Sequence, residues 1–117
     1  MPRFPVQGRI AACNVLSDLY ANAVTEIDTV LMALAVGVDM APSDRDIVTA
    51  HMIRGFTDVV RDAGASVTGG QTIFNPSPII GGIASRCAPL ATCGGLITSV
   101  SRLPPLQRAA RAGLHPP

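Results

Sequence analysis

The sequence contains no lysine and no tryptophan, and all nine of its basic residues are arginines. Without lysine, the chain by itself can form no Schiff base and cannot supply the phosphate-binding lysine of a P-loop. Acidic residues are missing from the last third, because all eight lie between Asp18 and Asp62. The net charge is only +1. The charge balance therefore indicates neither a nucleic-acid nor a membrane partner.

Cysteine is scarce and apolar runs are short. The three cysteines, Cys13, Cys87 and Cys93, lack Cys-x-x-Cys spacing, which favours neither a zinc site nor a disulfide framework. We expect reduced thiols, with Cys87 packed at a strand end. No apolar run reaches the roughly 18 residues of a membrane span, and the first residues lack the apolar core of a signal peptide. We therefore expect a cytoplasmic protein.

The elements that can be read from the pattern predict an α/β domain of the α+β type, in which a β-sheet is covered by two helices. The first expected elements are a helix over 9–22 that follows Gly8 and a strand over 29–38 that is buried on both faces. A second helix is expected to open with a Ser43/Asp46 capping box and to end at a left-handed Gly64. Two further strands are expected over 65–74 and 78–87. We interpret residues 1–87 as the domain and 88–117 as a divergent, weakly ordered tail.

Short polar side chains share one face of the first predicted helix. They are Asn14, Ser17, Asp18 and Asn22, at offsets of three and four residues. One interpretation is a solvated edge of an amphipathic helix. The other is a binding surface for Mg²⁺, which prefers hard oxygen ligands and is commonly held by one or two carboxylates together with nucleotide phosphates. An unpaired acid in an apolar wall would otherwise be costly, which favours the metal.

Two adjacent glycines interrupt the strand "VTGGQT", residues 67–72. Glycines inside a strand can mark a bulge or bend. They can also let backbone N–H groups approach phosphate oxygens, with Gln71 and Thr72 adding hydrogen bonds. The segment is not a P-loop, because the GxxxxGK[ST] pattern is missing. Both interpretations stay open on spacing alone.

Three segments, "NVLSDLYA", "AGASVTGGQT" and "NPSPIIGGIAS", occur in an order and at a separation that resemble selenophosphate synthetase. The likeness covers roughly residues 7–87. It implies the N-terminal ATP-binding domain of the aminoimidazole ribonucleotide synthetase-like superfamily, a homodimer, and phosphoryl transfer from ATP to selenide with release of AMP and orthophosphate. By the same resemblance, Asp18 is a Mg²⁺ and ATP ligand, and Gly69, Gly70, Gln71 and Thr72 contact ATP.

The resemblance also implies groups that this chain does not contain. The family's reactive Cys or selenocysteine and its companion lysine precede the matched region, so no catalytic residue is assigned. The resemblance implies a second domain with a further metal-binding aspartate as well, and we expect these 117 residues to be inactive without it. Two alternatives are another ATP-binding enzyme of the same superfamily and a non-catalytic module that dimerises with a full-length relative and regulates it.

Overall fold

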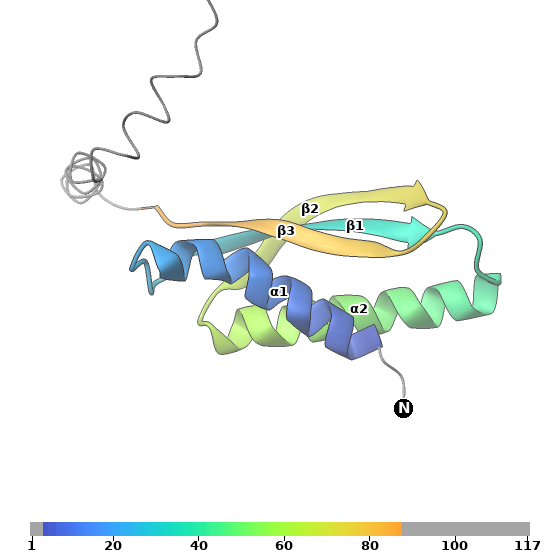
Figure 1. Ribbon diagram of the computed structural model, residues 1–117, viewed down its shortest axis with the longest axis horizontal. Helices are drawn as coiled ribbons and strands as arrows, with labels where there is room; N and C mark the ends of the chain where they lie inside the picture. The colour runs from blue at the N-terminus through green and yellow to red at the C-terminus, as the bar shows by residue number, and fades with distance from the viewer. Residues whose placement is uncertain (1–3, 88–117) are drawn as a thin grey trace, which may run out of the picture. The chain divides into compact units, whose positions relative to one another are not determined.

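A three-stranded mixed sheet with two helices on one face forms the fold of the computed structural model, which describes residues 4–87 (Figure 1). The predicted tail, 88–117, lies outside the described residues. The elements are α1 (Phe4–Ala21), β1 (Thr29–Gly37), α2 (Pro42–Asp62), β2 (Ser66–Asn75) and β3 (Ile79–Ser85). Their order along the chain is the predicted one, and the predicted fold class is confirmed.

Strand β1 lies at the centre of the sheet, between β2 and β3. Helix α2 makes the crossover that a parallel β1–β2 pair requires, and β3 then returns antiparallel along the other side of β1. Just beyond the end of β1, the Val38 N–H donates to the carbonyl of Asn75, the last residue of β2, at 2.9 Å. The edge strands are therefore β2 and β3.

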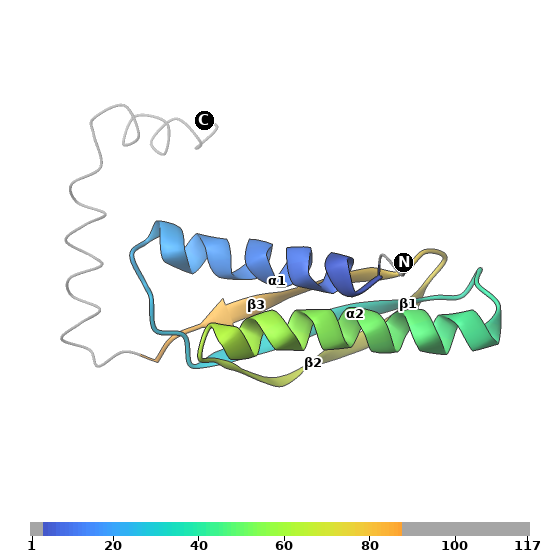
Figure 2. The ribbon, with the colours of Figure 1, turned by 90° about the horizontal axis from the view of Figure 1, so that it is seen from below.

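Both helices cover the same face of the sheet and run side by side beneath it (Figure 2). The core between them and the sheet is apolar. Its fully buried members include Phe56 and Val60 of α2, Ala12 of α1 and Val30 of β1. Because no helix covers the other face, Leu31 of β1 is 46% exposed there. The prediction that this strand is buried on both faces is wrong for the described residues.

Helix α1 begins at Phe4, before Gly8 rather than after it. Pro5 in the first turn has the fixed φ that suits a helix start. Gly8 lies inside the helix, where α1 crosses α2 so closely that a Cβ on Gly8 would lie 2.1 Å from the Met52 carbonyl oxygen. The glycine expected to precede the helix therefore permits helix packing instead.

Helix α2 begins with Pro42 after an Ala41 N-cap that makes no side-chain hydrogen bond. The predicted Ser43/Asp46 capping box is therefore wrong, and the proline provides the start signal because it needs no N–H partner in the first turn. Gly64 has a φ of +76°, which confirms the left-handed residue after the helix. The last turn is closed by the Gly64 N–H, which donates to the Arg61 carbonyl at 2.9 Å.

Candidate functional site

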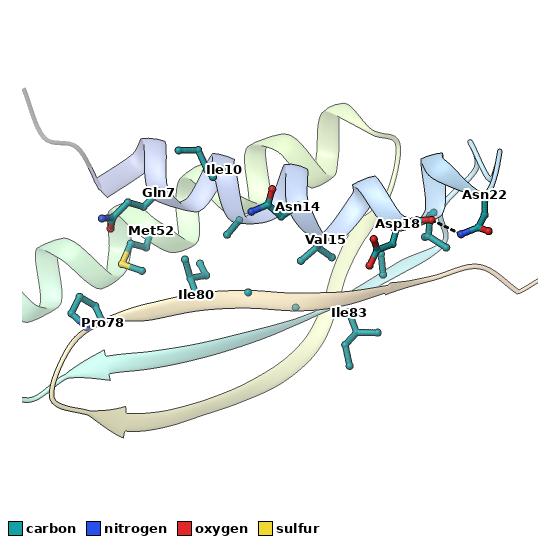
Figure 3. A pocket seen from close by; sticks show the side chains of 15 residues that line it. Gln7, Ile10, Asn14, Val15, Asp18, Asn22, Met52, Pro78, Ile80 and Ile83 are labelled. Atoms are coloured by element: carbon teal, nitrogen blue, oxygen red, sulfur yellow. Dashed lines mark hydrogen bonds between the residues drawn. The ribbon is translucent and has the colours of Figure 1, made fainter. Parts of the chain in front are cut away.

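A groove of about 770 Å³ lies between α1 and the edge strand β3 (Figure 3). One wall is α1 and the other is β3, with one residue from α2. The groove is lined by Gln7, Ile10, Ala11, Asn14, Val15, Asp18, Leu19, Asn22, Met52, Pro78 and the β3 residues Ile80 to Ala84. It therefore carries three of the four residues of the predicted polar stripe.

Asn14, Asp18 and Asn22 form the polar part of this groove. The Asp18 side chain extends from α1 toward β3 (Figure 3). The Asn22 amide nitrogen donates to the Asp18 backbone carbonyl at 2.7 Å, which leaves the Asp18 carboxylate out of that hydrogen bond. Ser17 is different, because its hydroxyl donates to the Asn14 backbone carbonyl at 2.7 Å and it does not line the groove. The predicted stripe thus reduces to one carboxylate between two amides.

Asp18 is exposed rather than set into an apolar wall. The described residues contain no buried polar or charged side chain. The argument that Asp18 needs a cation to offset the cost of burial is therefore wrong. Its exposure has a different consequence, because an exposed carboxylate beside a groove can be reached by a ligand from solvent without displacing any part of the fold.

The donor set fits Mg²⁺ bound to a nucleotide and does not fit a metal held by protein ligands alone. Within residues 4–87 no three His, Cys, Asp or Glu side chains gather closely enough to hold a metal ion. Mg²⁺ usually keeps several waters and binds one or two carboxylates together with substrate phosphates. One accessible carboxylate with neighbouring amide oxygens meets that smaller requirement.

The Gly-Gly-Gln-Thr segment lies in the middle of the edge strand β2. Val30 pairs with Val67 but Leu31 pairs with Gly69, so Thr68 is the extra residue of a β-bulge. The interpretation of the glycines as marks of a bulge is confirmed. Gly70 has a φ of +152°, and a Cβ there would lie 1.8 Å from the Met32 carbonyl oxygen. This glycine is required by close packing of the two strands.

The remaining residues of the segment are accessible. Gly69, Gln71 and Thr72 are all exposed. Gln71 pairs with Ala33 and so projects from the open face of the sheet, whereas Thr72 pairs with the buried Leu34 and projects from the helix-covered face. A ligand that contacts both side chains must therefore lie along the outer edge of β2 rather than on one face.

One copy of the chain does not bring Asp18 and the Gly-Gly-Gln-Thr segment together. Asp18 faces β3 at one edge of the sheet, and the segment belongs to β2 at the other edge. No β2 residue lines the groove. Strands β2 and β3 are separated by β1, a span of about 10 Å at ordinary strand spacing. The residues assigned to one ligand by resemblance thus form two separate surfaces.

The β3 wall of the groove is the part that sequence reasoning missed. Its signal was the Gly81-Gly82 pair, because a Cβ at position 82 would lie 3.2 Å from the Phe56 ring and 2.4 Å from the Leu31 carbonyl oxygen. Gly82 therefore lets Phe56 pack against the sheet next to the groove.

Cys87, predicted to be packed, is exposed.

Neither of the two helices in the described part of the chain is long and apolar enough to cross a membrane.

A solved structure shares this α/β arrangement. The crystal structure of the protein tt0281 from Thermus thermophilus superposes with a TM-score of 0.53 over 73% of this chain and 27% of that chain. The sequence identity is 20%, so the likeness concerns the fold alone. The fold and the groove define an α/β domain of the kind that forms one part of a larger protein.

The sequence matches the family described as AIR synthase related protein, N-terminal domain, over residues 4–97, and the chain belongs to that family. It is 55% identical over 80 residues to the selenide, water dikinase of Trypanosoma brucei brucei and 54% identical over 80 residues to selenide, water dikinase 3 of Danio rerio. These matches cover 68% of this chain, and 20% and 18% of the two relatives. The resemblance to selenophosphate synthetase is confirmed, and the chain spans about a fifth of the length of these relatives.

Proposed function

We propose that this chain supplies part of the Mg²⁺–ATP-binding surface for phosphoryl transfer to selenide, the reaction of ATP, selenide and water that gives selenophosphate, AMP and orthophosphate. The names of its relatives, which are selenide, water dikinases, support this reaction class. The observation that carries the proposal is the accessible Asp18 carboxylate in the α1–β3 groove, between Asn14 and Asn22. A Mg²⁺ ion held there would neutralise charge on the nucleotide phosphates.

Asp18 and the Gly-Gly-Gln-Thr segment have different parts in this proposal. Asp18 provides the anionic ligand for the ion. Gly69 leaves the outer edge of β2 uncovered by a side chain, so that phosphate oxygens can approach the backbone there. Gln71 and Thr72 reach this edge from opposite faces of the strand and would donate hydrogen bonds to the phosphates.

Two copies of the domain together would complete one site. Asp18 and β2 lie at opposite edges of the sheet, so a nucleotide can contact Asp18 of one chain and β2 of a second chain. This supports the homodimer that the resemblance implies. The open sheet face, with Leu31, Ile79 and Ile83 exposed on it, offers apolar surface for such an association.

A second candidate function is a non-catalytic module that binds a full-length relative through the same open face. The exposed apolar side chains of that face favour it, together with the lack of a three-ligand metal cluster among the described residues. The two functions differ in what they require of Asp18. Only the Mg²⁺–ATP-binding function needs the Asp18 carboxylate.

The test compares ATP binding to the 117-residue chain and to Asp18→Asn in the presence and absence of Mg²⁺, by isothermal titration calorimetry. We expect Asp18→Asn to weaken Mg²⁺-dependent binding at least about tenfold, because loss of one charged partner from an ion contact costs about 1.4 kcal/mol or more. Asp62→Asn is the matched control, since Asp62 is an exposed acid at the end of α2 that does not line the groove. Equal affinity of Asp18→Asn and the wild type would contradict the proposal.

Turnover by the chain alone is a separate prediction. Phosphoryl transfer depends on several positioned cations and ligands acting together. Among the described residues that line the groove, Asp18 is the one carboxylate. We therefore expect no AMP production above background when the purified chain is incubated with ATP, Mg²⁺ and selenide. Sustained selenide-dependent AMP production would show that the chain supplies a complete site.

A further inference from the structure

The β-bulge at Thr68 determines which face of β2 carries each residue of the Gly-Gly-Gln-Thr segment. In a regular pairing that continued from Val30 and Val67, Gln71 would lie opposite Leu34, on the face covered by the helices. With Thr68 as the extra residue, Gln71 lies opposite Ala33 on the open face and Thr72 takes the place opposite Leu34. A shift of one residue exchanges the two faces for every residue downstream.

The two glycines do not choose between these registers. The site opposite Met32 has no room for a Cβ, because the Met32 carbonyl oxygen would lie 1.8 Å from it. Gly70 occupies this site in the structure, and Gly69 would occupy it in the regular pairing. Since both residues lack a Cβ, steric exclusion permits either register.

The apolar pattern of β2 is equally permissive. Ile73 and Phe74 are 55% and 75% exposed, so neither side chain is held on one face by burial. Strands that are rich in glycine and poorly buried have a weakly specified register. The Val38 N–H bond to the Asn75 carbonyl holds the far end of β2 in the bulged pairing, and at the near end of the strand another interaction must favour it.

A contact between two hydroxyl groups meets this requirement. The Thr29 and Thr68 side-chain oxygens are joined by a hydrogen bond between β1 and β2, at the level of the bulge. Thr29 is the first residue of β1 and pairs with Ser66, so the bond ties the extra residue back to the start of the central strand. In the regular pairing Thr68 would move opposite Leu31, two residues farther along β1.

We infer that Thr68 is a positioning residue that sets the register of β2 and so places Gln71 and Thr72 on opposite sides of the edge that receives the nucleotide. The part of this inference that concerns the nucleotide rests on the proposed function. Thr68 acts through the strand and needs no contact with the ligand. The role belongs to the hydroxyl group, and Thr29 shares it.

Nuclear magnetic resonance of the isotope-labelled 117-residue chain measures the register directly. The native register gives cross-strand backbone contacts between Ala33 and Gln71, whereas the regular pairing places Gln71 next to Leu34. We expect Thr68→Val and Thr29→Val each to raise the population of the regular, unbulged register about two- to tenfold. This is the change that the loss of one net hydrogen bond causes. Thr68→Ser, which keeps the hydroxyl, is expected to match the wild type.

Binding of Mg²⁺–ATP to the same proteins links register to ligand. Affinity is expected to fall with the population of the native register in the two valine variants and to be retained in Thr68→Ser. Deletion of Thr68 removes the bulge but keeps Gly69 opposite Leu31, so it should bind within about twofold of the wild type. Loss of affinity in this deletion variant, with its register intact, would overturn the positioning role.

A single native register in both Thr68→Val and Thr29→Val would also overturn the inference. If one valine variant fails to fold, the other reports on the same hydrogen bond from the opposite strand. The proposed function fails separately. No Mg²⁺–ATP binding by the wild type, together with the regular, unbulged register in the valine variants, would overturn that function and confirm that Thr68 sets the register.

Discussion

At Gly8 a single missing Cβ allows α1 and α2 to touch. A Cβ at this position would lie 2.1 Å from the Met52 carbonyl oxygen and 2.8 Å from the Phe56 backbone nitrogen. Gly55 on α2 is equally restricted, since a Cβ there would lie 2.1 Å from the Pro5 carbonyl oxygen. Gly81, in contrast, has no atom within 4 Å of its ideal Cβ position. Glycines in this chain therefore differ in role.

Gly8→Ala is expected to lower the free energy of unfolding by about 1–3 kcal/mol. Alanine improves helix propensity by about 1 kcal/mol, but the added methyl forces the two helices apart and loosens the core that they share. Urea denaturation at one fixed protein concentration measures the change. Gly81→Ala is the control and should leave stability unchanged or raise it by less than about 1 kcal/mol. Equal effects of the two substitutions would contradict this account of the helix crossing.

At the scale of elements, the loop between β1 and α2 is fixed by one arginine. Arg45 donates three hydrogen bonds to backbone carbonyls, one at Gly37 at the end of β1 and two in the loop at Val38 and Met40, over 3.0 to 3.2 Å. The pattern of charges suggests that Arg45 belongs to a solvated helix face. It instead holds the end of the central strand against the first turn of α2, where the proline start leaves the loop without a side-chain cap.

The phase of the apolar stripe on α2 also depended on the packing of elements. The spacing of three and four residues predicts a helix whose apolar stripe begins at Ile47, and that starting residue is wrong. In the structure Val48 is 4% exposed and Ile47 is 57% exposed. The close crossing with α1 turns Met52 and Phe56 inward, and this selects Val48 as their neighbour one turn earlier.

At the scale of the whole molecule, the sheet has one covered and one open face. Ile83 points from β3 away from α1, and it is 69% exposed opposite Leu31 (Figure 3). Ile79 and Ile73 lie on the same open face, opposite Ala35 on either side of β1. An apolar face of this kind typically marks an interface with another protein.

Ile83→Thr is expected to shift the chain from dimer toward monomer in sedimentation-velocity experiments, because it removes apolar surface from the open face. Threonine keeps β-branching, so the strand itself should persist. Ile47→Thr is the matched control, because Ile47 is similarly exposed but lies on α2. An unchanged sedimentation coefficient for Ile83→Thr, or an equal shift for both variants, would argue against association through the open face.

The order and approximate bounds of the five elements were determined by the sequence alone, because hydrophobic period, proline and glycine act over a few residues. The residues that resemble the family's binding segments were also identified in this way, including Asp18 and Gly69 to Thr72. The exposure of Asp18, the central place of β1 and the register of β2 were decided only by tertiary structure. Each depends on contacts between segments far apart in the chain, and local pattern carries no record of which edge or face those segments take.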